Sequence, residues 1–116
     1  PLKEIFPSNV SKLKIRWMRQ FDTSDPTIEA TPLVVGGVIF TTVPPASIVA
    51  IDAKSGNVIW KYDRTVPPDL ALCCARVNRG LAILGDTLFL GSVDGRQREY
   101  RKDALGNPGG GCYRRV

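Results

Sequence analysis

The sequence predicts an all-β fold, because short apolar runs alternate with polar and glycine-containing turns along most of its 116 residues. Gly36-Gly37 and Gly56 stand in two of these turns, where a tight reversal needs a positive φ. The turns are short, so we expect neighbouring strands to pair as an antiparallel meander. The strands expected in the first part of the chain are 11–18, 31–35, 38–42, 47–52 and 58–62.

The pattern of strands and turns starts again in the second half of the chain. Val38-Ile39-Phe40 aligns with Leu88-Phe89-Leu90 at a spacing of 50, and a new hairpin is expected at 80–84 and 87–92. Asp103 to Asn107 then repeats the turn of the first copy. A repeat of this length built from four strands is typical of a β-propeller blade. One blade cannot bury both faces of its sheet, so we expect the chain to be part of a larger ring.

The second copy loses the strand pattern after Gly95. Residues 1–95 are therefore interpreted as about one and a half blades of the propeller, and 96–116 as a divergent basic tail without strands. We hypothesise that the tail is a frameshift or truncation product, which sequencing the coding DNA would test. A chain that opens on Pro1-Leu2-Lys3 is interpreted as a fragment or a processed product.

Composition excludes several kinds of site in this segment. The chain has no histidine, so Ser-His-Asp and Cys-His nucleophile pairs are excluded, and three cysteines are too few for a four-ligand zinc site. The net charge is +5, and residues 96–116 hold six basic and two acidic side chains, a net of +4. This tail does not interleave basic and aromatic residues on an expected strand or helix, so we expect no nucleic-acid partner.

Two adjacent cysteines, Cys73 and Cys74, form the most informative motif of the chain. Neighbouring Cα atoms lie about 3.8 Å apart, whereas ordinary disulfides span about 4.4–6.8 Å. A disulfide between neighbours therefore closes a strained ring, and strain of this kind is concentrated at functional sites. The alternative is a pair of reduced cysteines that pack as small apolar side chains. The residues by themselves leave both alternatives open.

The chain resembles the quinoprotein alcohol dehydrogenases, which use pyrroloquinoline quinone (PQQ), over roughly residues 1–95. The vicinal cysteines distinguish this family best from other propeller proteins, since the turn that ends in Trp60 is common in propellers. The resemblance implies an eight-bladed propeller of four-stranded sheets, whose blades dock through tryptophans placed as Trp60 is. The motifs that carry it are Asn9–Leu13 with Trp17, Glu29–Val35, Ala50–Trp60, Cys73-Cys74 and Val77–Gly80.

The resemblance also implies roles for four residues of the cofactor site. Cys73 and Cys74 would form a disulfide that lies flat against one face of the quinone. Arg79 would donate hydrogen bonds to the oxygens of the cofactor, since a guanidinium offers a planar fork of donors. Glu29 would contact the cofactor as well. The alternatives are that Arg79 is a solvated surface arginine and that Glu29 is an exposed acid at a strand edge. No catalytic or metal-binding residue is expected in this segment.

By the same resemblance, the complete protein would be a periplasmic enzyme that oxidises a primary alcohol to an aldehyde and passes electrons through PQQ to cytochrome c. A calcium or lanthanide ion would be held by ligands outside this segment, and the fragment alone is expected to be inactive. Membrane association of the complete protein stays open. The alternatives are a PQQ-dependent sugar or polyol dehydrogenase and a non-catalytic propeller scaffold.

Overall fold

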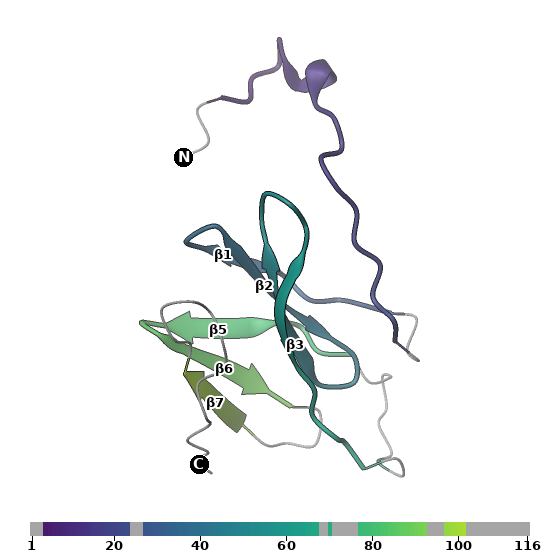
Figure 1. Ribbon diagram of the computed structural model, residues 1–116, viewed down its shortest axis with the longest axis vertical. Coiled ribbons are helices and arrows are strands. Elements are labelled where there is room, and N and C mark those ends of the chain that lie inside the picture. Colours follow the sequence, from purple (N-terminus) through teal and green to yellow (C-terminus); the bar gives the residue numbers. More distant parts are fainter. Residues whose placement is uncertain (1–3, 24–26, 68–69, 71–76, 93–96, 102–116) are drawn as a thin grey trace.

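The computed structural model describes residues 4–23, 27–67, 70, 77–92 and 97–101, and they form two antiparallel sheets (Figure 1). The described part contains no α-helix, and its one helical element is the 3-10 turn η1, Val10–Lys12. The all-β prediction is confirmed. The first sheet has the order β1-β2-β3-β4, with strands Leu33–Val35, Val38–Val43, Ser47–Asp52 and Val58–Tyr62. The second has the order β5-β6-β7, with strands Leu81–Leu84, Thr87–Gly91 and Gln97–Arg101.

The first hairpin shows why the expected meander forms. Val34 pairs with Ile39 and Val35 with Val38, so only Gly36 and Gly37 connect the strands. Their φ values are +59° and +79°. A two-residue turn with positive φ at both positions matches the right-handed twist of the strands that it joins, and glycine adopts this conformation without strain.

Both faces of the first sheet are covered. On one face, Phe40, Ile48, Ala50 and Trp60 share a buried cluster with residues of β6. On the other face, Val43, Val49 and Ile51 are buried together, with Trp17 and Phe21 packed against them. The period of two along β3 sends Ile48 and Ala50 to one cluster and Val49 and Ile51 to the other. The sheet therefore has the double-sided burial that a propeller blade needs.

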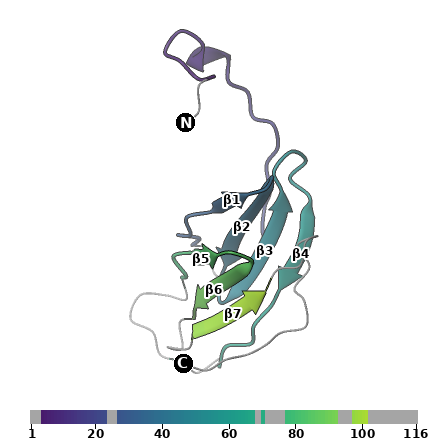
Figure 2. The same ribbon diagram turned by 90° about the vertical axis from the view of Figure 1, so that its left-hand side faces the viewer.

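Trp60 lies where the two sheets meet. It is buried, and its ring lies 6.1 Å from that of Phe40 at an interplanar angle of 48°. Leu88 and Leu90, from β6, belong to the same cluster, and Figure 2 shows the second sheet lying beside the first. The expectation that Trp60 serves contact between neighbouring sheets agrees with this position, which is structural and not part of a catalytic site.

The strand predicted at 11–18 is not formed. Val10–Lys12 is a 3-10 turn, and the chain from Leu13 onward is extended but pairs with no strand of the described residues. Leu13 and Ile15 are 60% and 80% exposed. The apolar alternation alone did not suffice for a strand, because a strand also needs a neighbour to accept its backbone hydrogen bonds.

Trp17 explains why this segment follows the first sheet. Its Nε1 donates a hydrogen bond of 3.0 Å to the carbonyl oxygen of Ala53, and Arg19 Nη2 donates one of 2.6 Å to the carbonyl oxygen of Gly56. The Trp17 ring lies over Gly56 so closely that a Cβ built there would stand 2.6 Å from Cδ2 of the indole. The turn between β3 and β4 is therefore a docking surface for Trp17, a role that the sequence analysis gave only to Trp60.

The expectation that strands end at Gly95 is wrong. Gln97–Arg101 forms β7 and pairs with β6 over five positions, from Gly91 opposite Gln97 to Thr87 opposite Arg101. This run lacks apolar alternation, but strand formation depends strongly on context, and an open edge of β6 supplies the pairing partner. The second repeat thus extends one strand further than predicted.

Residues 102–116, with Cys112, lie outside the described part. The domain division at 95 and the frameshift hypothesis stay predictions.

Asp52 organises the turn on which Trp17 docks. Its Oδ1 accepts hydrogen bonds from the backbone N–H groups of Lys54, at 3.1 Å, and Ser55, at 2.7 Å, and from the Ser55 hydroxyl, at 2.8 Å. Its carbonyl oxygen accepts another from Gly56 N–H, at 2.8 Å. The Ser55 N–H and hydroxyl hold the pKa of Asp52 below its ordinary value of 3.8.

We expect the Asp52→Asn variant to lose less stability than the unchanged protein when the pH is lowered. Because the folded-state pKa is lowered, the ionised carboxylate stabilises the turn fully above about pH 4, and this contribution is lost as the pH falls through the lowered pKa. Asparagine keeps an acceptor oxygen but does not titrate. Thermal midpoints between about pH 6 and pH 3 should therefore fall less steeply for Asp52→Asn than for the exposed control Asp22→Asn. Equal slopes would contradict the expectation.

Candidate functional site

A backbone bridge between the two sheets brings two predicted cofactor residues together. Thr31 forms an isolated parallel bridge with Gly80, and Thr31 N–H donates a hydrogen bond of 3.2 Å to the carbonyl oxygen of Arg79. Gly80 has a φ of +131°, and a Cβ on it would lie 3.1 Å from the carbonyl oxygen of Thr31. Glycine is therefore required at this position, both for its φ and for the close approach of the two segments.

Glu29 and Arg79 form an ion pair as a result. Arg79 Nη2 lies 3.3 Å from Glu29 Oε2, with side chains 83% and 39% exposed. An ion pair this exposed contributes at most about 1 kcal/mol to stability, so it is not what holds the loop in place. The ion pair matters because it places a carboxylate and a guanidinium side by side, from two residues that lie 50 positions apart and were predicted separately.

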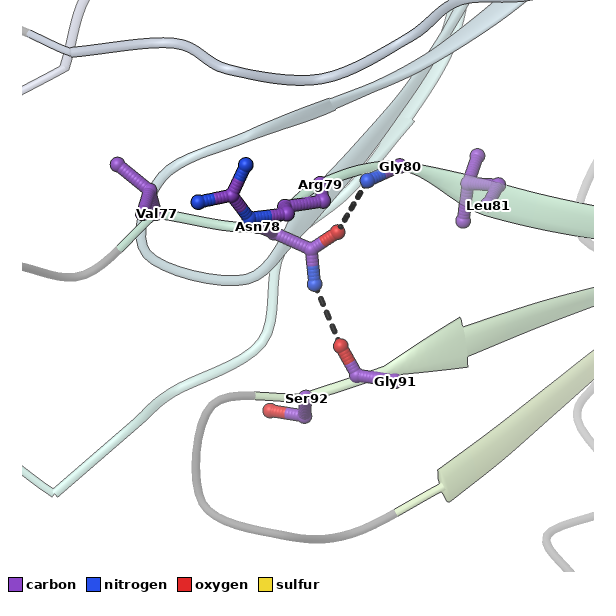
Figure 3. A pocket seen from close by; sticks show the side chains of 7 residues that line it. All are labelled: Val77, Asn78, Arg79, Gly80, Leu81, Gly91 and Ser92. Carbon is purple, nitrogen blue, oxygen red and sulfur yellow. Dashed lines mark hydrogen bonds between the residues drawn. The ribbon is translucent and has the colours of Figure 1, made fainter. Parts of the chain in front are cut away.

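Asn78 fixes the loop that carries Arg79. Its side chain is buried, and Oδ1 accepts a hydrogen bond of 2.9 Å from Gly80 N–H while Nδ2 donates one to the carbonyl oxygen of Gly91 (Figure 3). The Thr42 hydroxyl donates a further bond of 3.4 Å to the Asn78 carbonyl oxygen. The sequence analysis quoted Asn78 within its motif but gave it no role. A short amide next to a glycine at a strand start is a signal for such a local cap.

A cavity of about 480 Å³ opens beside this loop. Figure 3 shows the loop on one side and the end of β6 on the other, with the Asn78 amide between them. Ser92 is 7% exposed, and its Oγ is buried without a hydrogen-bond partner among the described residues. The cavity is lined by Val77, Asn78, Arg79, Gly80, Leu81, Gly91 and Ser92.

These groups fit an anionic, oxygen-rich cofactor. A guanidinium carries five N–H donors, more than the contact of Nη2 with one carboxylate oxygen of Glu29 uses. The buried hydroxyl of Ser92 adds a donor in the same cavity. Arginine and hydroxyl donors suit carboxylate and carbonyl oxygens. Cys73 and Cys74 lie outside the described residues, so the vicinal disulfide stays a prediction.

The part of the chain that the structure describes contains neither a metal-ligand cluster nor a membrane-spanning helix. No cluster of three His, Cys, Asp or Glu side chains that could hold a metal ion occurs among the residues whose positions are given. Likewise, none of the helical structure in that part of the chain is long and apolar enough to cross a membrane.

Residues 1–96 match the model of a protein family described as the PQQ glucose/ethanol/alcohol dehydrogenase β-propeller domain. The chain belongs to this family. The match covers β1 to β6 and every residue of the Glu29–Arg79 site, and it makes the two sheets parts of β-propeller blades. The resemblance found from the sequence is confirmed.

Individual relatives agree with this assignment. The quinohemoprotein alcohol dehydrogenase ADH IIB of Pseudomonas putida is 43% identical over 98 residues, and the 1-butanol dehydrogenase (cytochrome c) of Thauera butanivorans is 41% identical over 98 residues. Each match covers 83% of this chain but only 14% of the relative. Among solved structures, a europium-containing methanol dehydrogenase matches with a TM-score of 0.72 and 31% identity, over 90% of this chain and 19% of that one. The relatives are enzymes, and this chain spans about a seventh of their length.

Proposed function

We propose that this chain is the N-terminal part of a PQQ-dependent dehydrogenase that oxidises a primary alcohol to an aldehyde. Membership of the family and the names of the relatives support the reaction class. The observation that carries the assignment to this segment is the 3.3 Å pair of Glu29 and Arg79 beside the 480 Å³ cavity. The fragment alone would be inactive, since it supplies only part of an eight-bladed ring.

In this proposal the residues of the chain bind and orient the cofactor. Arg79 donates hydrogen bonds to its oxygens, and Glu29 holds the guanidinium and contacts the cofactor from the neighbouring blade. PQQ, when bound, supplies the redox chemistry by accepting two electrons from the alcohol.

Cys73 and Cys74 form a disulfide against one face of the quinone. Peptide mapping of the folded protein before reduction tests this pairing, and free alkylation of both thiols would overturn it.

We further propose a cytochrome c acceptor, a bound metal ion and a periplasmic location for the complete protein. One relative is named a cytochrome c-linked enzyme and another a quinohemoprotein, which supports a cytochrome c acceptor. The ion would be calcium or a lanthanide with ligands outside this segment, and a europium-containing relative supports the lanthanide. A disulfide at the cofactor favours the oxidising periplasm. Spheroplast fractionation of the native host tests the last point, because release with the cytoplasmic fraction would contradict it.

A PQQ-dependent sugar or polyol dehydrogenase is the second candidate. It is favoured by one observation, which is that the description of the matching family includes glucose as well as alcohols. Comparing dye reduction with primary alcohols and with glucose, using the full-length protein reconstituted with PQQ, separates the two candidates.

We expect Arg79→Ala to weaken PQQ binding by the full-length protein. Hydrogen bonds to charged groups contribute about 1.5–3 kcal/mol, so the dissociation constant should rise about tenfold to a hundredfold. Arg79→Lys keeps the charge but loses the planar fork, and its loss should be smaller. Titration of the apoprotein with PQQ, followed by tryptophan fluorescence, measures the effect. Arg16→Ala, at an exposed position on the N-terminal segment, is the control. Unchanged binding by Arg79→Ala would contradict the proposed function.

A further inference from the structure

Ser92 stands out among the buried polar groups of the described part. It follows the end of β6, is 7% exposed, and lines the cavity beside Arg79. Its Oγ has no hydrogen-bond partner among the described residues. Burying a hydroxyl without a hydrogen-bond partner costs free energy. An unpaired hydroxyl in a cavity wall therefore indicates that a bound molecule supplies the missing hydrogen bond.

The position of Ser92 is fixed by the same contacts that fix Arg79. Asn78 Nδ2 donates to the carbonyl oxygen of Gly91, the residue before Ser92, while Asn78 Oδ1 holds Gly80 N–H, the residue after Arg79. The side chain of Asn78 thus couples the two cavity walls. In Figure 3 the Ser92 hydroxyl and the Arg79 guanidinium lie on the same side of this coupling, away from β5 and β6. The cavity therefore presents a neutral donor and a charged donor from two separate segments.

We propose that Ser92 is a further cofactor-binding residue, whose Oγ–H donates a hydrogen bond to a carboxylate or carbonyl oxygen of the molecule that Arg79 holds. The inference rests on the proposed function, because it takes that molecule to be PQQ. A hydroxyl at this point adds a second, short donor from a different segment, so that a planar ligand would be held at two points instead of one. Ser92 would therefore set the orientation of the ligand as well as its affinity.

The test is a set of PQQ titrations with the full-length apoprotein. Ser92→Ala removes only the hydroxyl and should raise the dissociation constant about tenfold, the effect of one hydrogen bond to a charged acceptor. Ser92→Thr keeps the hydroxyl and should stay within about threefold of the unchanged protein. Ser11→Ala, at an exposed serine far along the chain from the cavity, is the matched control. The absorption spectrum of the bound cofactor and the thermal midpoint of each apoprotein are recorded with each titration.

Each result decides a different point. A tenfold loss in Ser92→Ala with rescue by Ser92→Thr, a shifted cofactor spectrum and unchanged midpoints supports the inference. Equal dissociation constants for Ser92→Ala and the unchanged protein overturn it while leaving the proposed function standing. Equal losses in both variants together with lowered midpoints assign the hydroxyl a structural role and also overturn it. If the unchanged protein binds no PQQ, the proposed function fails and the inference fails with it.

Discussion

Replacing Gly56 by alanine is expected to lower the free energy of unfolding by about 3 kcal/mol. Two independent costs combine at this residue. Its φ is +75°, a conformation that costs a residue with a Cβ about 1–2 kcal/mol. The added Cβ would also lie 2.6, 2.7 and 2.9 Å from three atoms of the Trp17 ring, so the indole must move and lose its hydrogen bond to Ala53.

A matched glycine separates these two costs. Gly85 has a φ of +57°, and a Cβ built there has no neighbour within 4 Å, so Gly85→Ala carries the conformational cost alone, about 1 kcal/mol. Urea titrations of the full-length protein, followed by tryptophan fluorescence, compare the two variants. If both lose the same stability, the Trp17 contact contributes nothing, and the docking role given to this turn is wrong.

Local patterns were sufficient where a strand's own residues decide its structure. Gly36-Gly37 between two apolar runs admits only a tight hairpin, and the period of two in 47–52 gives a strand with two buried faces. The sequence analysis placed both elements to within two residues. Its errors at 11–18 and after Gly95 share one cause. In each place, strand formation depends on whether a neighbouring strand is open for pairing, which the local residues do not show.

The residues of the candidate site likewise fall into those that the sequence predicted and those that it did not. Glu29 and Arg79 were identified through motifs that resemble a family, and the structure adds that their side chains meet. The predicted hairpin at 80–84 and 87–92 already brings the end of β6 next to the Arg79 loop. Asn78 and Ser92 were missed because the pattern does not show that the Asn78 side chain bonds Gly91 or that Ser92 lines the cavity. A buried hydrogen-bond partner is a property of three-dimensional packing, and one sequence carries little record of it.

Asn78→Ala is expected to lower the free energy of unfolding by about 3 kcal/mol and to weaken PQQ binding as well. The Asn78 amide bonds both the Gly80 N–H and the Gly91 carbonyl oxygen. Removing it leaves these two backbone groups without a hydrogen-bond partner at a buried position. The binding loss follows because the Gly80 bond holds the residue next to Arg79. Urea unfolding and PQQ titration of the full-length protein measure the two effects.

Two further variants identify which of the Asn78 bonds matters. Asn78→Asp keeps an acceptor for Gly80 N–H but turns the donor toward Gly91 into a second oxygen, so it should fold nearly as poorly as Asn78→Ala. Asn57→Ala, at an exposed asparagine in the β3–β4 turn, removes the same amide from a place where its side chain is solvated, and should change stability by less than about 0.5 kcal/mol. If Asn78→Asp instead retains the full stability, the bond to Gly91 is dispensable, and the coupling between the Arg79 loop and the Ser92 wall of the cavity rests on the pairing of β5 with β6, in which Leu81 lies opposite Leu90.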